Sequence, residues 1–274
     1  MRAAVLGSPI AHSLSPVLHR AAYRALGLAD HRYDRFEVDE AGLPGFLAGL
    51  DVVGEGWTGL SLTMPLKRVV IPLLDEVSAT ALAVDAVNTV LFHPDGRRTG
   101  DNTDVPGLVA ALRERGVTRV DRAAVLGAGA TASSALAALG QICDGEVTAY
   151  VRGPERAAQM QALGDGLGVK VGTAPWERAA EAFGTPLTIS TTPVGATDAL
   201  AAAVPEAPGT LFDVLYHPWP TPLAAAWANR GGTVLGGLDL LVHQAVLQCE
   251  LFTGIRPAPL AAMRAAGEAA LAGP

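Results

Sequence analysis

The sequence predicts an α/β protein with two domains, and three observations lead to that prediction. Short apolar runs typical of strands alternate with runs typical of helices along the chain, which favours mostly parallel sheets. The pentapeptide AAVLG occurs at 3–7 and again at 123–127, each time as an apolar run that ends at a glycine before a helix-like segment. The chain has 274 residues, which is enough for two modest domains.

Composition and charge narrow the class of protein. Half of the residues are hydrophobic and no long stretch lacks glycine, proline or polar residues, so we expect a sizeable core and no membrane span. The opening MRAAVLGSP enters a strand too early for a signal peptide. Cys143 and Cys249 have neither metal-ligand spacing nor a disulfide framework, so we expect no metal and a cytoplasmic location. The net charge of −7 argues against a nucleic-acid partner.

The first domain is expected to comprise residues 1–105 and 238–274, with the apolar, helical C-terminal segment returning to it. Its first helix lies in HSLSPVLHRAAYRALGL, where Ser15 suits the N-cap, Pro16 the first turn and Gly27 the C-terminal stop. We expect strands at 2–6, 32–38 and 57–63, followed by a hairpin in VNTVLFHPDGRRTGDN that turns at PDG.

The second domain is expected to comprise residues 106–237. Its alternation of strand-like and helix-like runs predicts a doubly wound, nucleotide-binding sheet. We expect its strands at 123–127, 146–152, 169–173, 187–191, 210–216 and 233–237.

The segment GAGATA, residues 127–132, fits the glycine pattern of a dinucleotide-binding turn. Gly127 permits the tight turn, Gly129 lets the backbone approach a pyrophosphate, and Ala132 allows close packing of helix on strand. The same spacing also fits a plain tight turn, but the apolar strand before it and the helical run after it favour a dinucleotide. The other expected cofactor contacts of this turn are Ala128, Ala130 and Thr131.

The end of the next strand indicates which dinucleotide binds. A cofactor with an unmodified ribose usually meets an acidic residue there, but this chain reads YVRGPER. Arg152 and Arg156 suit a 2′-phosphate, so we expect NADP in preference to NAD. The alternative is two solvated arginines, with Glu155 able to pair with either.

Polar side chains gather at the expected turns and strand ends of the first domain, where α/β proteins place their sites. Ser13 and Ser15 put two hydroxyls beside a helix N-terminus, which is a mild anion site. The segments SLTMPLK, DAVNT and GDNTD add Thr63, Lys67, Asn88 and Asp104. Each has a plainer interpretation: a capped helix with a spare serine, a surface lysine, an amide in a turn, and an aspartate capping a helix near Pro106.

Together these motifs resemble the shikimate dehydrogenase family. The runs GSPIAHSLSP, SLTMPLK, VNT, DNTD, GAGATA, YHPWPTPL and GLDLLVHQA occur in family order over nearly the whole chain. The resemblance implies NADPH-dependent, reversible reduction of 3-dehydroshikimate to shikimate in aromatic amino-acid (chorismate) biosynthesis. It also implies an N-terminal α/β domain for the substrate and a Rossmann-type domain for NADP.

The resemblance also implies roles for individual residues. Ser13 and Ser15 match serines that hold the substrate carboxylate, and Gln244 matches a substrate-binding glutamine on the C-terminal helix. Lys67 is expected to exchange the proton while Asp104 orients it. The remaining assignments are Thr63 and Asn88 near the ring hydroxyls, Tyr216 near both ligands, and Val214 and Gly237 near the cofactor.

Some positions depart from the family pattern and leave alternatives open. Ser61 replaces a common asparagine, Ala130 a usual glycine, and Val151 and Gly153 replace the Asn and Thr of many members. A quinate or aminoshikimate dehydrogenase and a non-catalytic metabolite sensor share the scaffold, and the sequence leaves open whether the protein is a monomer or a homodimer. Methylenetetrahydrofolate dehydrogenase is disfavoured because Thr63 stands where that enzyme typically has tyrosine.

Overall fold

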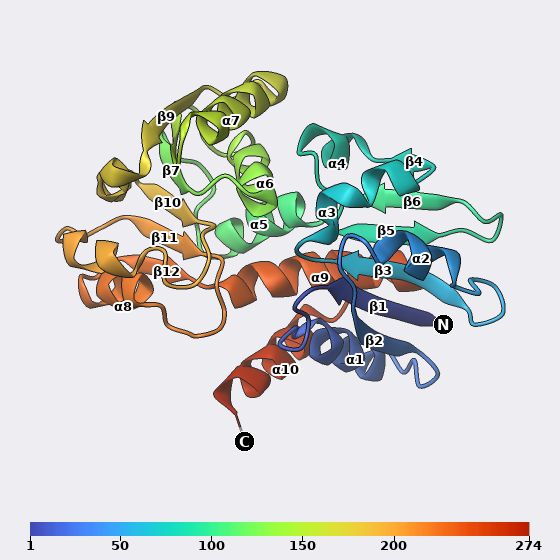
Figure 1. The fold of residues 1–274 in the computed structure, drawn as a ribbon. Helices are drawn as coiled ribbons and strands as arrows, with labels where there is room; N and C mark the ends of the chain where they lie inside the picture. Colours follow the sequence, from blue (N-terminus) through green and yellow to red (C-terminus); the bar gives the residue numbers. More distant parts are fainter. Residues whose placement is uncertain (274) are drawn as a thin grey trace. The chain divides into compact units, whose positions relative to one another are not determined.

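The computed structural model describes residues 1–273, which form two compact units (Figure 1). Unit 1 consists of Met1–Thr103 and the chain from Leu241 onward, and unit 2 consists of Asp104–Leu240. The chain therefore leaves unit 1 once and returns to it. The helix α9, Gly237–Thr253, carries the return. Both units are α/β, as the alternation of apolar runs predicts.

Unit 1 is built on a six-stranded sheet with the strand order β2-β1-β3-β5-β6-β4. The pairs β1–β2, β1–β3 and β4–β6 are parallel, whereas β5 runs antiparallel to both β3 and β6. The predicted hairpin at PDG is thus inserted into an otherwise parallel sheet. The strands are β1 (Arg2–Gly7), β2 (Arg32–Glu37), β3 (Trp57–Leu62), β4 (Glu76–Val77), β5 (Thr89–Phe92) and β6 (Arg98–Asp101).

The helices of unit 1 cover this sheet with apolar faces. The C-terminal helix α10 packs against α1, so the last helix of the chain lies beside the first (Figure 1). Leu6, Leu60 and Val90 are fully or almost fully buried in one core cluster. The helices are α1 (Ser15–Ala25), α2 (Leu43–Ala48), α3 (Leu66–Val69), the 3-10 helix η1 (Ile71–Leu73), α4 (Ala79–Ala83), α10 (Leu260–Ala272) and most of α9.

Unit 2 contains a fully parallel six-stranded sheet in the order β12-β11-β10-β7-β8-β9. This order is that of a doubly wound sheet, with β7 and β10 side by side where the winding changes direction. The strands are β7 (Ala123–Leu126), β8 (Val147–Val151), β9 (Val171–Pro175), β10 (Leu187–Ser190), β11 (Thr210–Asp213) and β12 (Thr233–Leu235). The helical segments are α5 (Asp104–Glu114), α6 (Ala130–Leu139), α7 (Pro154–Leu167), η2 (Trp176–Gly184), η3 (Asp198–Ala203) and α8 (Pro222–Asn229).

Several strand boundaries differ from those predicted. The strand expected at 169–173 is Val171–Pro175, because Val169 and Lys170 lie in the turn that follows α7. The strand expected at 210–216 ends at Asp213, ahead of a loop with prolines at 218 and 220, which cannot donate to a sheet ladder. The strand expected at 233–237 ends at Leu235, because α9 begins at Gly237.

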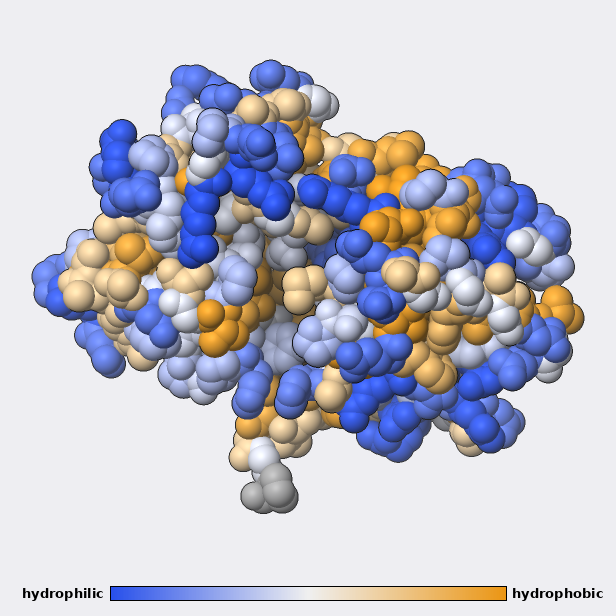
Figure 2. Space-filling model, viewed as in Figure 1, coloured by the Kyte–Doolittle hydropathy of each residue, from blue (hydrophilic) through white to orange (hydrophobic). Residues whose placement is uncertain are grey.

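The molecular surface carries a few exposed apolar side chains. In unit 1, Figure 2 shows apolar residues gathered over the segment that contains α3, η1 and α4, and Met64 and Leu82 are 66% and 57% exposed. None of the helices within residues 1–273 is both long and apolar enough to cross a membrane.

The imidazole of His19 is fully buried in unit 1. It stacks on the ring of Tyr33, with centroids 4.0 Å apart and planes 6° from parallel, and Phe252 lies beside it. Burial lowers the pKa of His19 to about 3, because a charged imidazolium would lose its hydration there. The folded protein therefore contains a neutral histidine.

This burial predicts how stability depends on pH. The unfolded chain takes up a proton at His19 below the ordinary pKa of 6.5, whereas the folded chain does so only near 3. The contribution of His19 is thus complete above pH 6.5 and is lost as the pH falls from 6.5 toward 3, at up to about 1.4 kcal/mol per pH unit. Urea unfolding between pH 7 and 4 should show a smaller loss for His19→Phe than for the wild type. If the free energy of unfolding of His19→Phe fell with pH as steeply as that of the wild type, the prediction would be wrong. The exposed His12 provides the control, as His12→Gln.

Candidate functional site

The predicted turns of unit 1 meet at one edge of its sheet, where β1 and β3 end and β5 begins. Here the Thr63 N–H donates to the Leu6 carbonyl at 3.0 Å, and the Leu62 N–H donates to the Asn88 carbonyl at 2.8 Å. The Val87 N–H donates to the Lys67 carbonyl at 2.7 Å. The segments that carry Thr63, Lys67 and Asn88 are therefore backbone neighbours, although they are far apart in the sequence.

Ser13 and Ser15 follow β1, and their roles at the start of α1 differ from those predicted. Helix α1 begins at Ser15 itself, and its N-cap is Leu14, which makes no side-chain capping bond. The predicted N-cap role of Ser15 is wrong, because Leu14 is already in the helical region at φ −85°, ψ −6°, whereas a side-chain cap needs extended backbone. The Ser13 hydroxyl instead accepts the Ser15 N–H at 3.3 Å. Ser15 is buried and Ser13 half-buried.

The amide of Asn88 is 1% exposed and is held by Thr103 and Thr89. Its Oδ1 accepts the Thr103 N–H at 2.8 Å and the Thr89 hydroxyl at 2.8 Å, and its Nδ2 donates to the Thr103 hydroxyl at 2.9 Å. The Thr103 hydroxyl also lies 3.5 Å from Gln244 Oε1 on α9. The structure thus brings Asn88 and Gln244 together through Thr103, a residue of the GDNTD segment that is not among the predicted site residues.

The predicted catalytic pair lies at two different places in the chain. Lys67 is half-buried in the four-residue helix α3 of unit 1. Asp104 follows Thr103 directly, is 5% exposed, and is the first residue of α5 and of unit 2. The helix considered as starting near Pro106 therefore begins two residues earlier, with Asp104 in its first turn.

The glycine-rich turn of unit 2 has the geometry that was predicted. Gly127 adopts φ +109°, a conformation that favours glycine, and a Cβ there would lie 2.7 Å from Thr191 Oγ1. Gly129 is the N-cap of α6 without any side-chain cap, and a Cβ placed on it would have no atom within 4 Å. The N-terminus of α6 thus has no side-chain cap and has open space beside Gly129, as an anion at a helix N-terminus requires. Ala132 is fully buried.

The two predicted phosphate-reading arginines flank the start of α7. Gly153, at φ +81°, is the N-cap of this helix. The Arg152 guanidinium lies 5.4 Å from the centroid of the Trp176 ring, and Arg156 Nη1 donates to Gln159 at 3.1 Å. Within residues 1–273 neither arginine forms an ion pair with Glu155, so both positive charges remain available to an anion.

The predicted contacts after β11 and at the start of α9 touch one another. The Gly237 N–H donates to the Leu215 carbonyl at 2.9 Å, and a Cβ on Gly237 would lie 2.1 Å from the Val214 carbonyl oxygen. This close approach requires glycine. Tyr216 lies in the same loop, and burial raises its pKa.

A buried aspartate that the sequence analysis missed shapes this loop. Asp213 accepts a hydrogen bond from the Thr221 hydroxyl at 2.7 Å and one from the Leu215 N–H at 3.3 Å. Burial raises the pKa of this carboxyl group. Both ends of the loop that carries Val214 and Tyr216 are therefore tied to one side chain. An acidic residue at the end of an apolar strand was the available signal.

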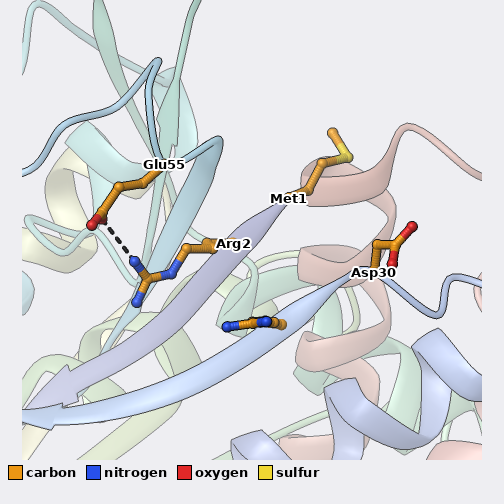
Figure 3. A pocket seen from close by; sticks show the side chains of 5 residues that line it. Met1, Arg2, Asp30 and Glu55 are labelled. Atoms are coloured by element: carbon orange, nitrogen blue, oxygen red, sulfur yellow. Dashed lines mark hydrogen bonds and ion pairs between the residues drawn. The ribbon is translucent and has the colours of Figure 1, made fainter.

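A pocket of about 310 Å³ lies elsewhere in unit 1, at the amino ends of its parallel strands (Figure 3). Arg2 donates to Glu55 at 2.7 Å and lies over the Trp57 ring at 4.5 Å. Side chains of both charge signs line this pocket, and no predicted site residue is among them. The lining residues are Met1, Arg2, Asp30, Arg32 and Glu55. Residues 1–273 also contain no group of three or more His, Cys, Asp or Glu side chains placed to hold a metal.

Comparison with known proteins identifies the family. The shikimate dehydrogenase substrate binding domain matches residues 5–90, and the shikimate 5′-dehydrogenase C-terminal domain matches residues 237–266. A shikimate dehydrogenase (NADP(+)) of Synechococcus sp. (strain JA-3-3Ab) is 36% identical, over 98% of this chain and 93% of that protein. The chain belongs to the shikimate dehydrogenase family.

Solved structures of shikimate dehydrogenases have the same fold. That of the Mycobacterium tuberculosis enzyme superposes with a TM-score of 0.86 at 41% identity, over 97% of this chain and 98% of the other. The Thermus thermophilus enzyme in complex with NADP(H) and shikimate superposes with a TM-score of 0.83 at 35% identity, over 98% of both chains. The family resemblance and the fold predicted from the sequence motifs are both confirmed.

The contact between Gly237 and Val214 predicts a specific sensitivity to an added methyl group. Gly237→Ala should lower the free energy of unfolding by about 1–3 kcal/mol, because a Cβ cannot occupy space 2.1 Å from a backbone oxygen. It should also weaken NADPH binding, measured by fluorescence titration, because the loop with Val214 must shift.

The neighbouring glycine provides the control. The nearest atoms to a Cβ on Gly236 belong to the ring of Trp219, from 2.8 Å, and this side chain is 41% exposed and able to move. Gly236→Ala should therefore have the smaller effect on both measurements. Equal losses in the two variants would show that the Val214 contact is unimportant.

Proposed function

We propose that this protein catalyses the reversible, NADP-linked reduction of 3-dehydroshikimate to shikimate, a step of aromatic amino-acid biosynthesis. The observation that carries the proposal is the 36% identity to an NADP-dependent shikimate dehydrogenase over 98% of the chain. The site motifs of that family lie at the predicted turns and strand ends. The domain roles follow: unit 1 takes the substrate and unit 2 takes NADP.

The polar groups of unit 1 suit a hydroxylated cyclic acid. Ser13 and Ser15 supply hydroxyls beside the start of α1, where partial positive charge from the helix favours a carboxylate. Thr63, Asn88 and Gln244 supply neutral donors and acceptors for ring hydroxyls. Neutral hydrogen-bonding groups are appropriate, because a ring hydroxyl carries no charge.

The geometry of unit 2 fits NADP. Gly127 and the open N-terminus of α6 suit the pyrophosphate. Arg152 and Arg156 suit the 2′-phosphate, because a guanidinium is a planar cation of the kind that binds phosphate, and that of Arg152 lies over the Trp176 ring. Val214, Tyr216 and Gly237 are the residues proposed to lie near the nicotinamide.

The reaction requires hydride transfer coupled to proton transfer. Bound NADPH supplies the hydride to the carbonyl carbon of the substrate. In our proposal the Lys67 ammonium gives its proton to the carbonyl oxygen, which becomes the hydroxyl, and in the reverse direction the Lys67 amine takes it back. Asp104 orients Lys67 and a substrate hydroxyl.

Related activities and assignments are separated by direct assay. Initial rates with shikimate and quinate, each with NADP and NAD, distinguish the proposed activity from that of a quinate dehydrogenase, and an aminoshikimate arm tests the amino-substituted alternative. Absence of turnover with every pair would support a metabolite sensor.

Cys143 and Cys249 are both free thiols, which supports our proposal of a cytoplasmic location. Monomer and homodimer remain alternatives.

The role of Lys67 gives a kinetic prediction. Lys67→Met should lower kcat by about 10²–10⁴, the usual scale of general acid–base catalysis, and should leave the shikimate KM within a few-fold. A lysine that only bound substrate would instead raise KM. Steady-state kinetics, with calorimetric binding as the folding control, separate the two. A near-normal kcat would remove Lys67 from the mechanism.

The role of Arg152 gives a prediction about cofactor selectivity. Charge-assisted hydrogen bonds contribute about 1.5–3 kcal/mol, so Arg152→Ala should lower kcat/KM with NADPH by about 10–150-fold and spare NADH. Arg230→Ala removes an exposed arginine of unit 2 that pairs with Glu206, and should change neither value. An equal loss with both cofactors would exclude phosphate recognition by Arg152.

A further inference from the structure

A continuous chain of buried hydrogen bonds crosses unit 1 and ends at Asn88. The Tyr33 hydroxyl lies 2.6 Å from Ser61 Oγ, and Ser61 Oγ lies 2.6 Å from Gln248 Oε1. Gln248 Nε2 donates to the Thr89 hydroxyl at 2.9 Å, which donates to Asn88 Oδ1 at 2.8 Å. All five residues are at most 4% exposed, so the chain of hydrogen bonds is shielded from bulk solvent.

The direction of every hydrogen bond in this chain is fixed by the backbone. Gln248 Nε2 lies 3.1 Å from the carbonyl oxygen of Asn88, which can only accept, so this end of the Gln248 amide must be the NH₂ group. The opposite end is Oε1, which can only accept, so Ser61 must donate to it. The single proton of Ser61 is then used, and Ser61 must accept from Tyr33.

The same reasoning fixes the amide of Asn88. Thr89 accepts from Gln248 Nε2, and its own hydroxyl donates to Asn88 Oδ1. The Thr103 N–H, which can only donate, points at the same oxygen from 2.8 Å. A flipped Asn88 amide would place its NH₂ hydrogens against both donors. Asn88 can therefore meet a ligand only as a donor, through Nδ2.

We propose that Gln248 is a positioning residue that fixes the donor orientation of Asn88 toward a ring oxygen of the substrate. Ser61 and Tyr33 fix the orientation of Gln248 in turn. This inference rests on the proposed function, because that function provides the hydroxylated substrate to which Asn88 donates. Gln248 lies four residues after Gln244 on α9, so the two amides share one helix face. Burial raises the pKa of Tyr33 far above 10, which keeps its hydroxyl protonated as a donor.

The first test compares two variants of the chain with one matched control. Gln248→Met keeps the length of the side chain and removes its amide, and should raise the shikimate KM by about 5–15-fold, the value of one or two neutral hydrogen bonds. Ser61→Ala leaves Gln248 without its donor and should raise KM by about 2–5-fold. The KM for NADP should stay unchanged in both variants.

The control is Ser78→Ala. The Ser78 hydroxyl also donates at 2.6 Å, to Asp101, but this bond has no part in the chain that ends at Asn88. Ser78→Ala should lower the melting temperature and leave the shikimate KM unchanged. A KM increase in Ser78→Ala equal to that in Ser61→Ala would show general loosening of the unit and overturn the proposal.

A double-mutant cycle separates positioning from a merely structural role. If Gln248 acts through Asn88, then Gln248→Met should raise the shikimate KM by less than about 2-fold once Asn88→Ala is present. Fully multiplicative effects of the two substitutions would overturn the proposal. Should Gln248→Met fail to fold, the same cycle with Ser61→Ala decides the question.

A measurement without turnover distinguishes this inference from the proposed function. The side-chain amide NMR signals of Asn88 should move in Gln248→Met and stay in place in Ser78→Ala. Unchanged Asn88 signals would overturn the positioning role whatever the substrate. A wild type that fails to oxidise shikimate with NADP would overturn the proposed function, and the NMR result would then decide the positioning of Asn88 alone.

Discussion

The need to hydrogen-bond the buried amide of Asn88 organises the substrate side of the fold. This side chain is 1% exposed, and an unpaired polar group at such a place is costly. The partners of the side-chain amide come from the start of β5 and from the segment after β6. Gln248 of α9 donates to the backbone carbonyl of the same residue. Strand, hairpin and returning helix are therefore joined at one residue, and the return of the chain to unit 1 is a chemical requirement of the site.

Unit 2 uses glycine to keep its proposed cofactor site free of side chains. Where unit 1 fills its sheet edge with hydroxyls and amides, the corresponding edge of unit 2 is cleared of side chains at Gly127, Gly129 and Gly237. Backbone N–H groups and a close backbone contact replace side-chain chemistry there. The two copies of AAVLG thus begin similar strand–turn–helix units that differ in what the turn presents.

The sequence was sufficient for the fold because the apolar runs and the turn residues agree with one another. It was also sufficient for the glycine turn, whose backbone demands have few alternatives. It failed at Ser15, because serine before proline suits either the N-cap or the first helical position, and the conformation of Leu14 decides between them. It assigned no site role to Asp213, Thr103 or Gln248, because their roles depend on contacts between segments that are distant in the sequence. Ser61 and Gln248, for example, are separated by 187 positions.

The antiparallel hairpin β5–β6 has a consequence for how this protein tolerates change. Both of its ends lie at the site edge, with Thr89 opposite Asp101, whereas its tip around Gly96 lies at the far end of the strands. The Gly96 N–H donates to the His93 carbonyl of the same turn at 2.9 Å. Insertions or fusions at this tip lengthen a loop whose entropic cost grows slowly with length. They leave the spacing between Asn88 and Thr103 untouched, so the hairpin keeps a loop that can change in length apart from the geometry of the site.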